Sequence, residues 1–298
     1  MAVREPRPIR RSRSGAISRR SFLRRAGLAT GAALGAGGGL FWYGASFEPN
    51  QLETTHLRIP LRSLPPAFDG LTVAQVSDLH LGRYTSARRV RQVVDAVMAL
   101  RPELIVVTGD HVDRLSHGEA EVLAGELSRL SAQLGVYAIL GNHDHWTDAD
   151  TVAGALVHAG LRLLRNARAR LELEGQVLYL AGVDDVWERK HDLGRALDGL
   201  PPQACVVLLA HEPDLADEVA RDGRVGLQLS GHSHGGQIVV PGLGPPVLPT
   251  LGQKYPSGLR QVREMWLYTN RGIGMVNPPF RLNCPPEITL LTLQASIA

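Results

Sequence analysis

Five short motifs rich in His, Asp and Asn stand out in this 298-residue sequence, and each directly follows an apolar run. In chain order they are Asp78-Leu79-His80, Gly109-Asp110, Gly141-Asn142-His143-Asp144, His211 and Gly231-His232-Ser233-His234. Imidazole nitrogens, carboxylate oxygens and an amide oxygen, without thiolate, suit Mn, Fe, Zn, Ni or Co better than a soft Cu(I) site. Any one of these residues alone would be an ordinary surface or turn residue. Together and in this order they predict a metal centre.

The chemistry that this set of ligands can support is the hydrolysis of a phosphate ester. Two divalent ions about 3.5–4 Å apart lower the pKa of a bound water toward neutrality and neutralise charge on the phosphoryl oxygens. A carboxylate has two oxygens and can bridge both ions, and an Asn carbonyl binds an ion without cancelling its charge. The expected cofactor is therefore a pair of divalent ions, and the expected partner is a phosphate-ester substrate.

The spacing of the motifs favours convergence of their side chains. Asp78 and His80 are two residues apart, as are His232 and His234, and an extended backbone sends alternate side chains to the same face. The runs before the motifs are rich in Val, Ile and Leu, as is typical of strands buried on both faces. An open α/β sheet places its site at the carboxyl ends of such strands. These runs cover residues 71–76, 104–108, 136–140, 205–210 and 225–230. Glycine precedes three of the ligands, where we expect tight turns and close approach of a metal to the backbone: Gly109, Gly141 and Gly231.

In full motif order, the residues from Asp78 to His234 resemble the calcineurin-like metallophosphoesterase superfamily. The resemblance implies that His143 is no permanent ligand but faces the scissile phosphate, where it protonates the leaving oxygen or stabilises the transition state. It implies that Asp144 orients His143 by accepting its other N–H. It also implies two sets of metal ligands that share one carboxylate: Asp78, His80, Asp110 and His234 for one ion, and Asp110, Asn142, His211 and His232 for the other.

The rest of the pattern predicts the elements that position these residues. Helices are expected over 86–100, 119–134, 148–158, 192–200 and 215–221, and further strands over 51–59, 161–164, 171–173, 177–181, 265–269 and 288–293. Strands that alternate with helices early, and strands without helices late, predict two packed sheets flanked by helices. The resemblance implies the same α/β architecture, a four-layer α-β-β-α sandwich of two mixed sheets.

A loop rich in Gly and Pro over residues 235–260 follows the last ligand motif, so we expect it to wall the substrate cleft. The alternative is a plain connector. We find no second-domain boundary and expect one catalytic domain over residues 47–298.

The N-terminal region has the pattern of an export signal. Residues 1–25 contain nine Arg and one Glu, a net +8, so the rest of the chain carries −5 of the total +3. Ser18-Arg-Arg-Ser-Phe-Leu23 matches a twin-arginine signal, and residues 26–46 follow without a charged residue. We expect the twin-arginine export machinery as a partner and a place in the cell envelope, either membrane-anchored by residues 26–46 or periplasmic. The alternatives are an Arg-rich arm that binds nucleic acid and a buried core helix over 26–46, which its glycines disfavour by roughly 1 kcal/mol each.

These observations predict a metal-dependent phosphoesterase that hydrolyses a phosphodiester or pyrophosphate-type bond, on an envelope or lipid-linked substrate. The tail segments 269–274 and 281–288 also resemble the bacterial envelope branch of the superfamily. A phosphomonoesterase or a nuclease of the same superfamily stays open, although the acidic body argues against nucleic acid as a partner. The alternative from another class is a membrane-tethered binding module without turnover.

The remaining His and Cys residues receive no ligand role. His111 and His145 are expected to be polar loop residues, with contact to substrate as the alternative. Cys205 is expected to be a small buried hydrophobe, and its place in a strand argues against a disulfide with Cys284. The other imidazoles are expected at the surface or beside the motifs without a ligand slot: His56, His117, His158 and His191.

Overall fold

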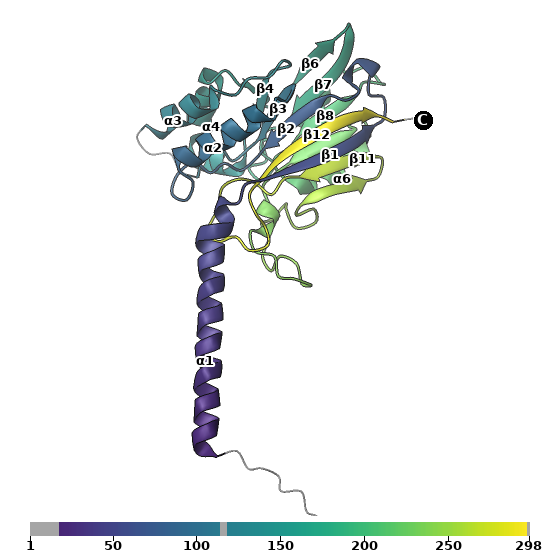
Figure 1. Cartoon of the computed structure of the whole chain (residues 1–298). Coiled ribbons are helices and arrows are strands. Elements are labelled where there is room, and N and C mark those ends of the chain that lie inside the picture. The colour runs from purple at the N-terminus through teal and green to yellow at the C-terminus, as the bar shows by residue number, and fades with distance from the viewer. Residues whose placement is uncertain (1–17, 114–117, 297–298) are drawn as a thin grey trace, which may run out of the picture. The chain divides into compact units, whose positions relative to one another are not determined.

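The computed structural model describes residues 18–113 and 118–296, and the chain divides into two units, residues 1–42 and 43–298 (Figure 1). In the first unit, helix α1 (Arg19–Trp42) has no buried residue, so residues 26–42 are not part of a core. Within the described ranges, no helix combines the length and apolarity that a bilayer crossing needs. Much of the basic region 1–25, and His117, lie outside the described residues.

The second unit is built on two six-stranded mixed sheets. The strand order of the first sheet is β1 (Glu53–Leu61), β12 (Glu287–Ala295), β2 (Thr72–Val76), β3 (Leu104–Thr108), β4 (Val136–Ile139) and β5 (Arg162–Leu163). Strand β12 pairs parallel to β1 and antiparallel to β2, and the other neighbouring strands pair parallel. The order of the second is β10 (Gly258–Val262), β11 (Met265–Thr269), β9 (Leu227–Ser230), β8 (Val206–Leu209), β7 (Gln176–Gly182) and β6 (Ala167–Leu173). Its two outer pairs are antiparallel and its inner pairs are parallel.

Helices cover the outer faces of both sheets. The first sheet packs on α2 (Ala87–Ala99), α3 (Glu119–Leu127) and α4 (Asn142–His158), and the second on α5 (Leu193–Leu197) and α6 (Ala216–Asp222) (Figure 1). Single turns of helix complete the fold: η1 (Tyr43–Phe47), η2 (Glu48–Asn50), η3 (Pro66–Phe68), η4 (Pro213–Leu215) and η5 (His234–Gly236).

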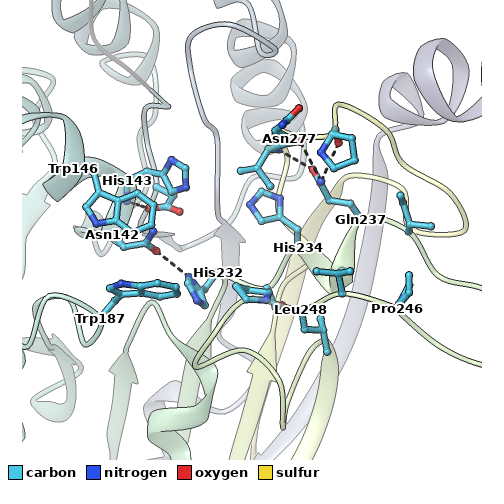
Figure 2. Close-up of a pocket in the computed structure, with 18 residues that line it drawn as sticks. Asn142, His143, Trp146, Trp187, His232, His234, Gln237, Pro246, Leu248 and Asn277 are labelled. Atoms are coloured by element: carbon cyan, nitrogen blue, oxygen red, sulfur yellow. Dashed lines mark hydrogen bonds between the residues drawn. The ribbon is translucent and has the colours of Figure 1, made fainter.

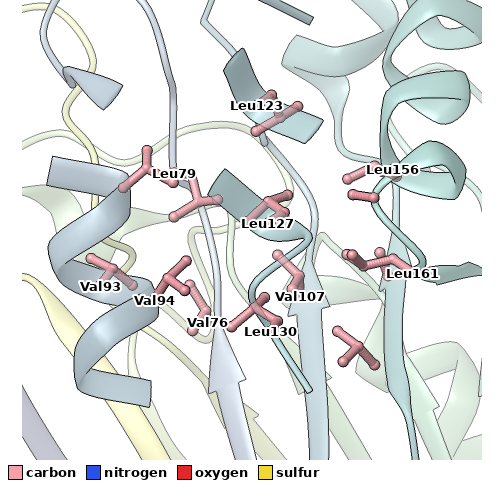
Figure 3. Close-up of a cluster of buried hydrophobic side chains, with 14 of the residues drawn as sticks. Val76, Leu79, Val93, Val94, Val107, Leu123, Leu127, Leu130, Leu156 and Leu161 are labelled. Atoms are coloured by element: carbon pink, nitrogen blue, oxygen red, sulfur yellow. The ribbon is translucent and has the colours of Figure 1, made fainter. Parts of the chain in front are cut away.

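Three apolar clusters hold the layers together. On α2, Val90, Val93, Val94 and Val97 follow helical spacing and are buried against the first sheet, beside Val76 and Val107 (Figure 3). Burying each such side chain contributes roughly 1.5–3 kcal/mol. A second cluster fills the space between the two sheets, and a third lies between the second sheet and its helices. This confirms the four-layer sandwich predicted from the sequence.

Several element boundaries differ from the expectation. Helix α4 begins at Asn142 rather than near residue 148, because Asp148 (φ −174°) only breaks it and caps the following turn through the backbone N–H groups of Asp150 and Thr151. Helix α3 ends at Leu127 instead of 134, and β10 begins inside the range expected to be loop, at Gly258. Both cysteines are buried free thiols, which confirms the expectation that no disulfide joins them.

Candidate metal centre

The seven predicted metal ligands converge at one edge of the sandwich. They follow the carboxyl ends of β2, β3, β4, β8 and β9, and each is at most 5% exposed. The ligand atoms of Asp78, His80 and His234 lie within 4.8 Å of one another, as do those of Asp110, His211 and His232. Each of these two groupings combines residues from both sheets.

The backbone at this edge is strained. Five of the seven predicted ligands adopt positive φ, a region that non-glycine residues rarely occupy: Asp78 (53°), His80 (46°), Asp110 (52°), His232 (69°) and His234 (52°). Backbone hydrogen bonds hold two of them in this conformation: Asp78 N–H donates to Gly109 O and His80 N–H donates to Asp110 O, both at 3.0 Å. Strain of this kind persists where the surrounding structure over-determines it, typically at functional sites.

The glycines before the ligands have two different roles. Gly109 has φ +92° and makes the tight turn that was expected. Gly141 does not need a positive φ (−117°); it leaves room for Asp110 and His211, because a Cβ there would lie 2.7 Å from Asp110 N and 2.8 Å from His211 Nε2. Gly231 likewise leaves no space for a Cβ beside Ser77 and Asp78.

In the first grouping, two imidazoles face two carboxylates. Nε2 of His80 lies 3.0 Å from Nε2 of His234 and 3.5 Å from Oδ2 of Asp110, and Nε2 of His234 lies 3.4 Å from Oδ1 of Asp78. Burial lowers the pKa of His80 to about 3 and that of His234 well below its usual value, so both rings are neutral and can donate lone pairs. Burial also raises the pKa of Asp78 to about 6, because the site has little water to solvate its charge.

In the second grouping, a backbone carbonyl fixes the tautomer of a ligand. Nδ1 of His211 must donate to Thr108 O (2.7 Å), since a carbonyl only accepts. Its Nε2 has no aligned hydrogen-bond partner in the described part of the chain and lies 3.2 Å from Asp110 Oδ2. Burial alone would raise the pKa of Asp110, but His211 outweighs it and holds that pKa well below the usual value. Burial alone would lower the pKa of His211, yet Asp110 raises it well above the ordinary value.

His232 and Asn142 complete this grouping. Nε2 of His232 donates to Thr250 O (2.8 Å), which leaves a lone pair on Nδ1, 2.9 Å from Asn142 Oδ1 (Figure 2). With the Asn142 amide in this orientation, a lone pair on His232 Nδ1 faces a lone pair on Asn142 Oδ1 inside the protein. A cation beside these two atoms would bind both lone pairs. These buried lone pairs, the unpartnered nitrogen of His211 and the absence of thiolate fit a pair of divalent ions.

His143 lies where the sequence predicted, but its partner differs. It is partly exposed, its ring centroid is 4.6 Å from that of His80, and its Nδ1 is 3.3 Å from Asp113 Oδ1. The expectation that Asp144 orients His143 is wrong: Asp144 accepts from Gly141 N–H and from both the backbone and the ring of His111. The reason is that Asp144 lies in the first turn of α4, where its carboxylate turns back to cap the helix. Asp113 was missed, although it lies only three residues after Asp110 in the same loop.

The histidines without a ligand role have three different environments. His111 lies in the loop after β3, as expected, but it is fully buried against Asp144. His145 lies in helix α4 rather than in a loop; its side chain is 6% exposed and lies 2.8 Å from Asp184. His56 and His158 are exposed, as expected, and His191 is half-buried.

A cavity of about 370 Å³ opens in front of the ligands. Figure 2 shows Asn142, Trp146 and Trp187 on one side of it and Gln237, Asn277 and Leu248 on the other. Residues 236–238 and 246–249 belong to its lining, so the Gly/Pro loop walls the cleft and is no plain connector.

A layered α/β sandwich with a buried, thiolate-free His/Asp/Asn site at its strand ends, beside an open cavity, has the ligand types of a metal-dependent hydrolase of phosphate esters. The sequence model of the calcineurin-like phosphoesterases matches residues 71–236, more than half of the chain and every predicted ligand. The chain belongs to the calcineurin-like phosphoesterase family and is a hydrolase that acts on phosphate esters.

Relatives match over nearly the whole chain. An uncharacterized metallophosphoesterase of Bacillus subtilis, YkuE, is 37% identical over 94% of this chain and 99% of its own length. Phosphodiesterase YaeI of Escherichia coli is 32% identical over 93% of this chain and 99% of its own length. The UDP-2,3-diacylglucosamine pyrophosphatase LpxG of Chlamydia trachomatis is 28% identical over 85% of this chain and 92% of its own length.

Proposed function

We propose that the chain is a dinuclear phosphodiesterase in which both ions would share Asp110 as a ligand. The observation that carries this proposal is the position of Asp110 Oδ2, 3.5 Å from His80 Nε2 in one grouping and 3.2 Å from His211 Nε2 in the other. Asp78, His80 and His234 would complete one site, and Asn142, His211 and His232 would complete the other. When bound, the two ions would supply an activated water and neutralise charge on the phosphoryl oxygens.

His143 is the proposed general acid. It lines the cavity beside the ligands, and its Nδ1 faces Asp113, which leaves Nε2 as the nitrogen that can give a proton to the leaving oxygen. The Asp113 carboxylate lies against Nδ1 of His143 and so holds the ring with Nε2 directed away from it.

We also propose a place for the enzyme in the cell envelope. The support is the twin-arginine pattern at Arg19 and Arg20, followed by the uncharged segment 26–46, ahead of a catalytic domain over 47–298. LpxG, a relative along most of the chain, is named for a pyrophosphatase activity on a diacylated nucleotide sugar. A lipid-linked or other envelope phosphodiester or pyrophosphate is therefore the proposed substrate class.

The test combines metal analysis with turnover of bis(p-nitrophenyl) phosphate by the purified full chain supplied with Mn²⁺. We expect His143→Ala to keep its metal and lose most of its turnover, and Asp110→Asn to lose both. His158→Ala, an exposed position on the same helix as His143, is the control and should change neither. Normal turnover by either site variant would contradict the proposal.

A further inference from the structure

Beyond the metal centre, the cavity in front of the ligands is mostly apolar. Its lining includes Ile238, Val247, Leu248 and Val276, together with Trp146, while Gln237 and Asn277 add polar groups. Among the described residues that line it, none is Lys or Arg. A volume of about 370 Å³ exceeds the need of a phosphate group, so this cavity has room for a substituent attached to phosphorus.

A second hollow with a different character meets the first at the proposed general acid. It shares His143, Trp146, Val276 and Asn277 with the cavity. It adds polar groups: Arg83, Tyr84, Asp113 and Thr147. The guanidinium of Arg83 is exposed and lies 5.3 Å from the ring centroid of Tyr84, so it is available to a ligand in this groove. The scissile position therefore has an apolar cavity on one side and a polar groove on the other.

The lack of Lys and Arg in the cavity lining bears on the substituent that the cavity can take. A phosphodiester has two alcohol substituents and can fill both hollows, whereas a phosphomonoester has one and can fill only one of them. The ions would neutralise charge on the phosphoryl oxygens, but a charged substituent in the cavity would leave water without a Lys or Arg to compensate for it. An alkyl or aryl group, in contrast, gains free energy when it leaves water against Leu248 and Val276.

We propose that the substrate is an asymmetric phosphodiester whose apolar alcohol occupies the cavity and whose polar alcohol lies in the groove beside Arg83. This rests on the proposed function and gives its substrate a defined form. Hydrolysis adds the hydroxyl of water to phosphorus, breaks one P–O ester bond and transfers a proton to the released alkoxide. The products are one alcohol and one phosphomonoester.

The experiment uses the full chain with Mn²⁺ and a series of alkyl phosphoglycerols with methyl, butyl or octyl chains, and product formation is measured by mass spectrometry. We expect kcat/KM to rise at least about tenfold from methyl to octyl, because each methylene fully removed from water contributes about fourfold. Octyl phosphate, the matched monoester, should be turned over far more slowly than octyl phosphoglycerol.

Matched variants test the apolar cavity and the polar groove separately. Leu248→Asn replaces an apolar side chain of the cavity lining by a polar one and should remove most of the chain-length gain while keeping the metal content. Leu243→Asn, in the same loop but 86% exposed and outside the cavity lining, is the control. Arg83→Gln should remove the preference for octyl phosphoglycerol over octyl propyl phosphate, which we expect to be about fivefold for one hydrogen bond. Arg88→Gln, at an exposed residue nearby, should keep it.

Turnover of bis(p-nitrophenyl) phosphate with no chain-length effect, or equal turnover of octyl phosphate, would overturn this inference and leave the proposed function standing. A chain-length effect that Leu248→Asn does not reduce would also contradict it. Failure to hydrolyse any diester in the presence of metal would overturn the proposed function itself.

Discussion

Replacing Gly141 by Ala should disable the metal centre without altering any ligand. The added Cβ would lie 2.8 Å from His211 Nε2 and 2.7 Å from Asp110 N, and closer still to the carboxylate of Asp110. Ordinary contacts of a Cβ begin near 3.4 Å, so these groups must move by about 0.6 Å or more. Neither can move freely, because His211 is held by Thr108 O and the Asp110 carboxylate by the N–H of His143.

The expected loss is large because two proposed ligands are displaced at once. A misplacement of about 1 Å can cost about a hundredfold in rate, and we expect kcat/KM for bis(p-nitrophenyl) phosphate to fall at least that far. Metal content, measured by elemental analysis after dialysis, should fall below two ions per chain. Circular dichroism should still report a folded protein, because the change is confined to the edge of the sandwich.

The control is Gly154→Ala in helix α4, which begins directly after Gly141. A Cβ at Gly154 meets nothing within 4 Å, so this variant should keep full activity and gain about 0.5–1 kcal/mol in the free energy of unfolding. If Gly141→Ala instead kept its metal content and a turnover within about threefold of wild type, the steric reasoning for this glycine would be refuted.

Three further predictions follow from single contacts. Asp113→Asn should lower kcat about tenfold with unchanged metal content, because the carboxylate lies 3.3 Å from Nδ1 of His143 and fixes the orientation of its ring. An equal loss of metal would contradict this positioning role. Although burial alone would raise it, the pKa of Asp184 lies below its usual value because His145 and Arg165 donate to the carboxylate. The contribution of ionised Asp184 to the free energy of unfolding is thus complete above the ordinary carboxyl pKa and is lost as pH falls through the lower pKa of the folded state. In urea unfolding in mild acid, Asp184→Asn should therefore lack this part of the pH dependence of stability. Burial raises the pKa of Cys205 to about 12, so Ellman's reagent should label this thiol at pH 8 only after unfolding.

The parts of the fold that depend on local pattern could be predicted from the sequence. The runs 104–108 and 265–269 coincide with β3 and β11, because a strand buried on both faces leaves a continuous apolar signal. The convergence of Asp78 with His234, 156 residues away, was predicted because both follow such strands, at whose carboxyl ends an α/β sheet places its site. The two strands belong to different sheets, whose carboxyl ends meet at this edge of the sandwich.

The rest depends on contacts that spacing does not encode. The insertion of β12 between β1 and β2 joins the two ends of the body, and nothing in the sequence of residues 287–295 specifies that place. The choice between Asp113 and Asp144 as partner of His143 depends on which way the first turn of α4 points its carboxylate. Strand β10 was missed because the prolines before it mask a short edge strand.

The origin of the ligands in both sheets has a consequence for the fold itself. Residues 78–142 would supply three of the four proposed ligands of one ion and two of the four proposed ligands of the other. Residues 211–234 would supply the rest, so a bound ion would link the two sheets of the sandwich. The free energy of ion binding would then also stabilise the packing of the two sheets against each other. Chelation should therefore abolish activity and also lower the free energy of unfolding, because no disulfide joins the two sheets.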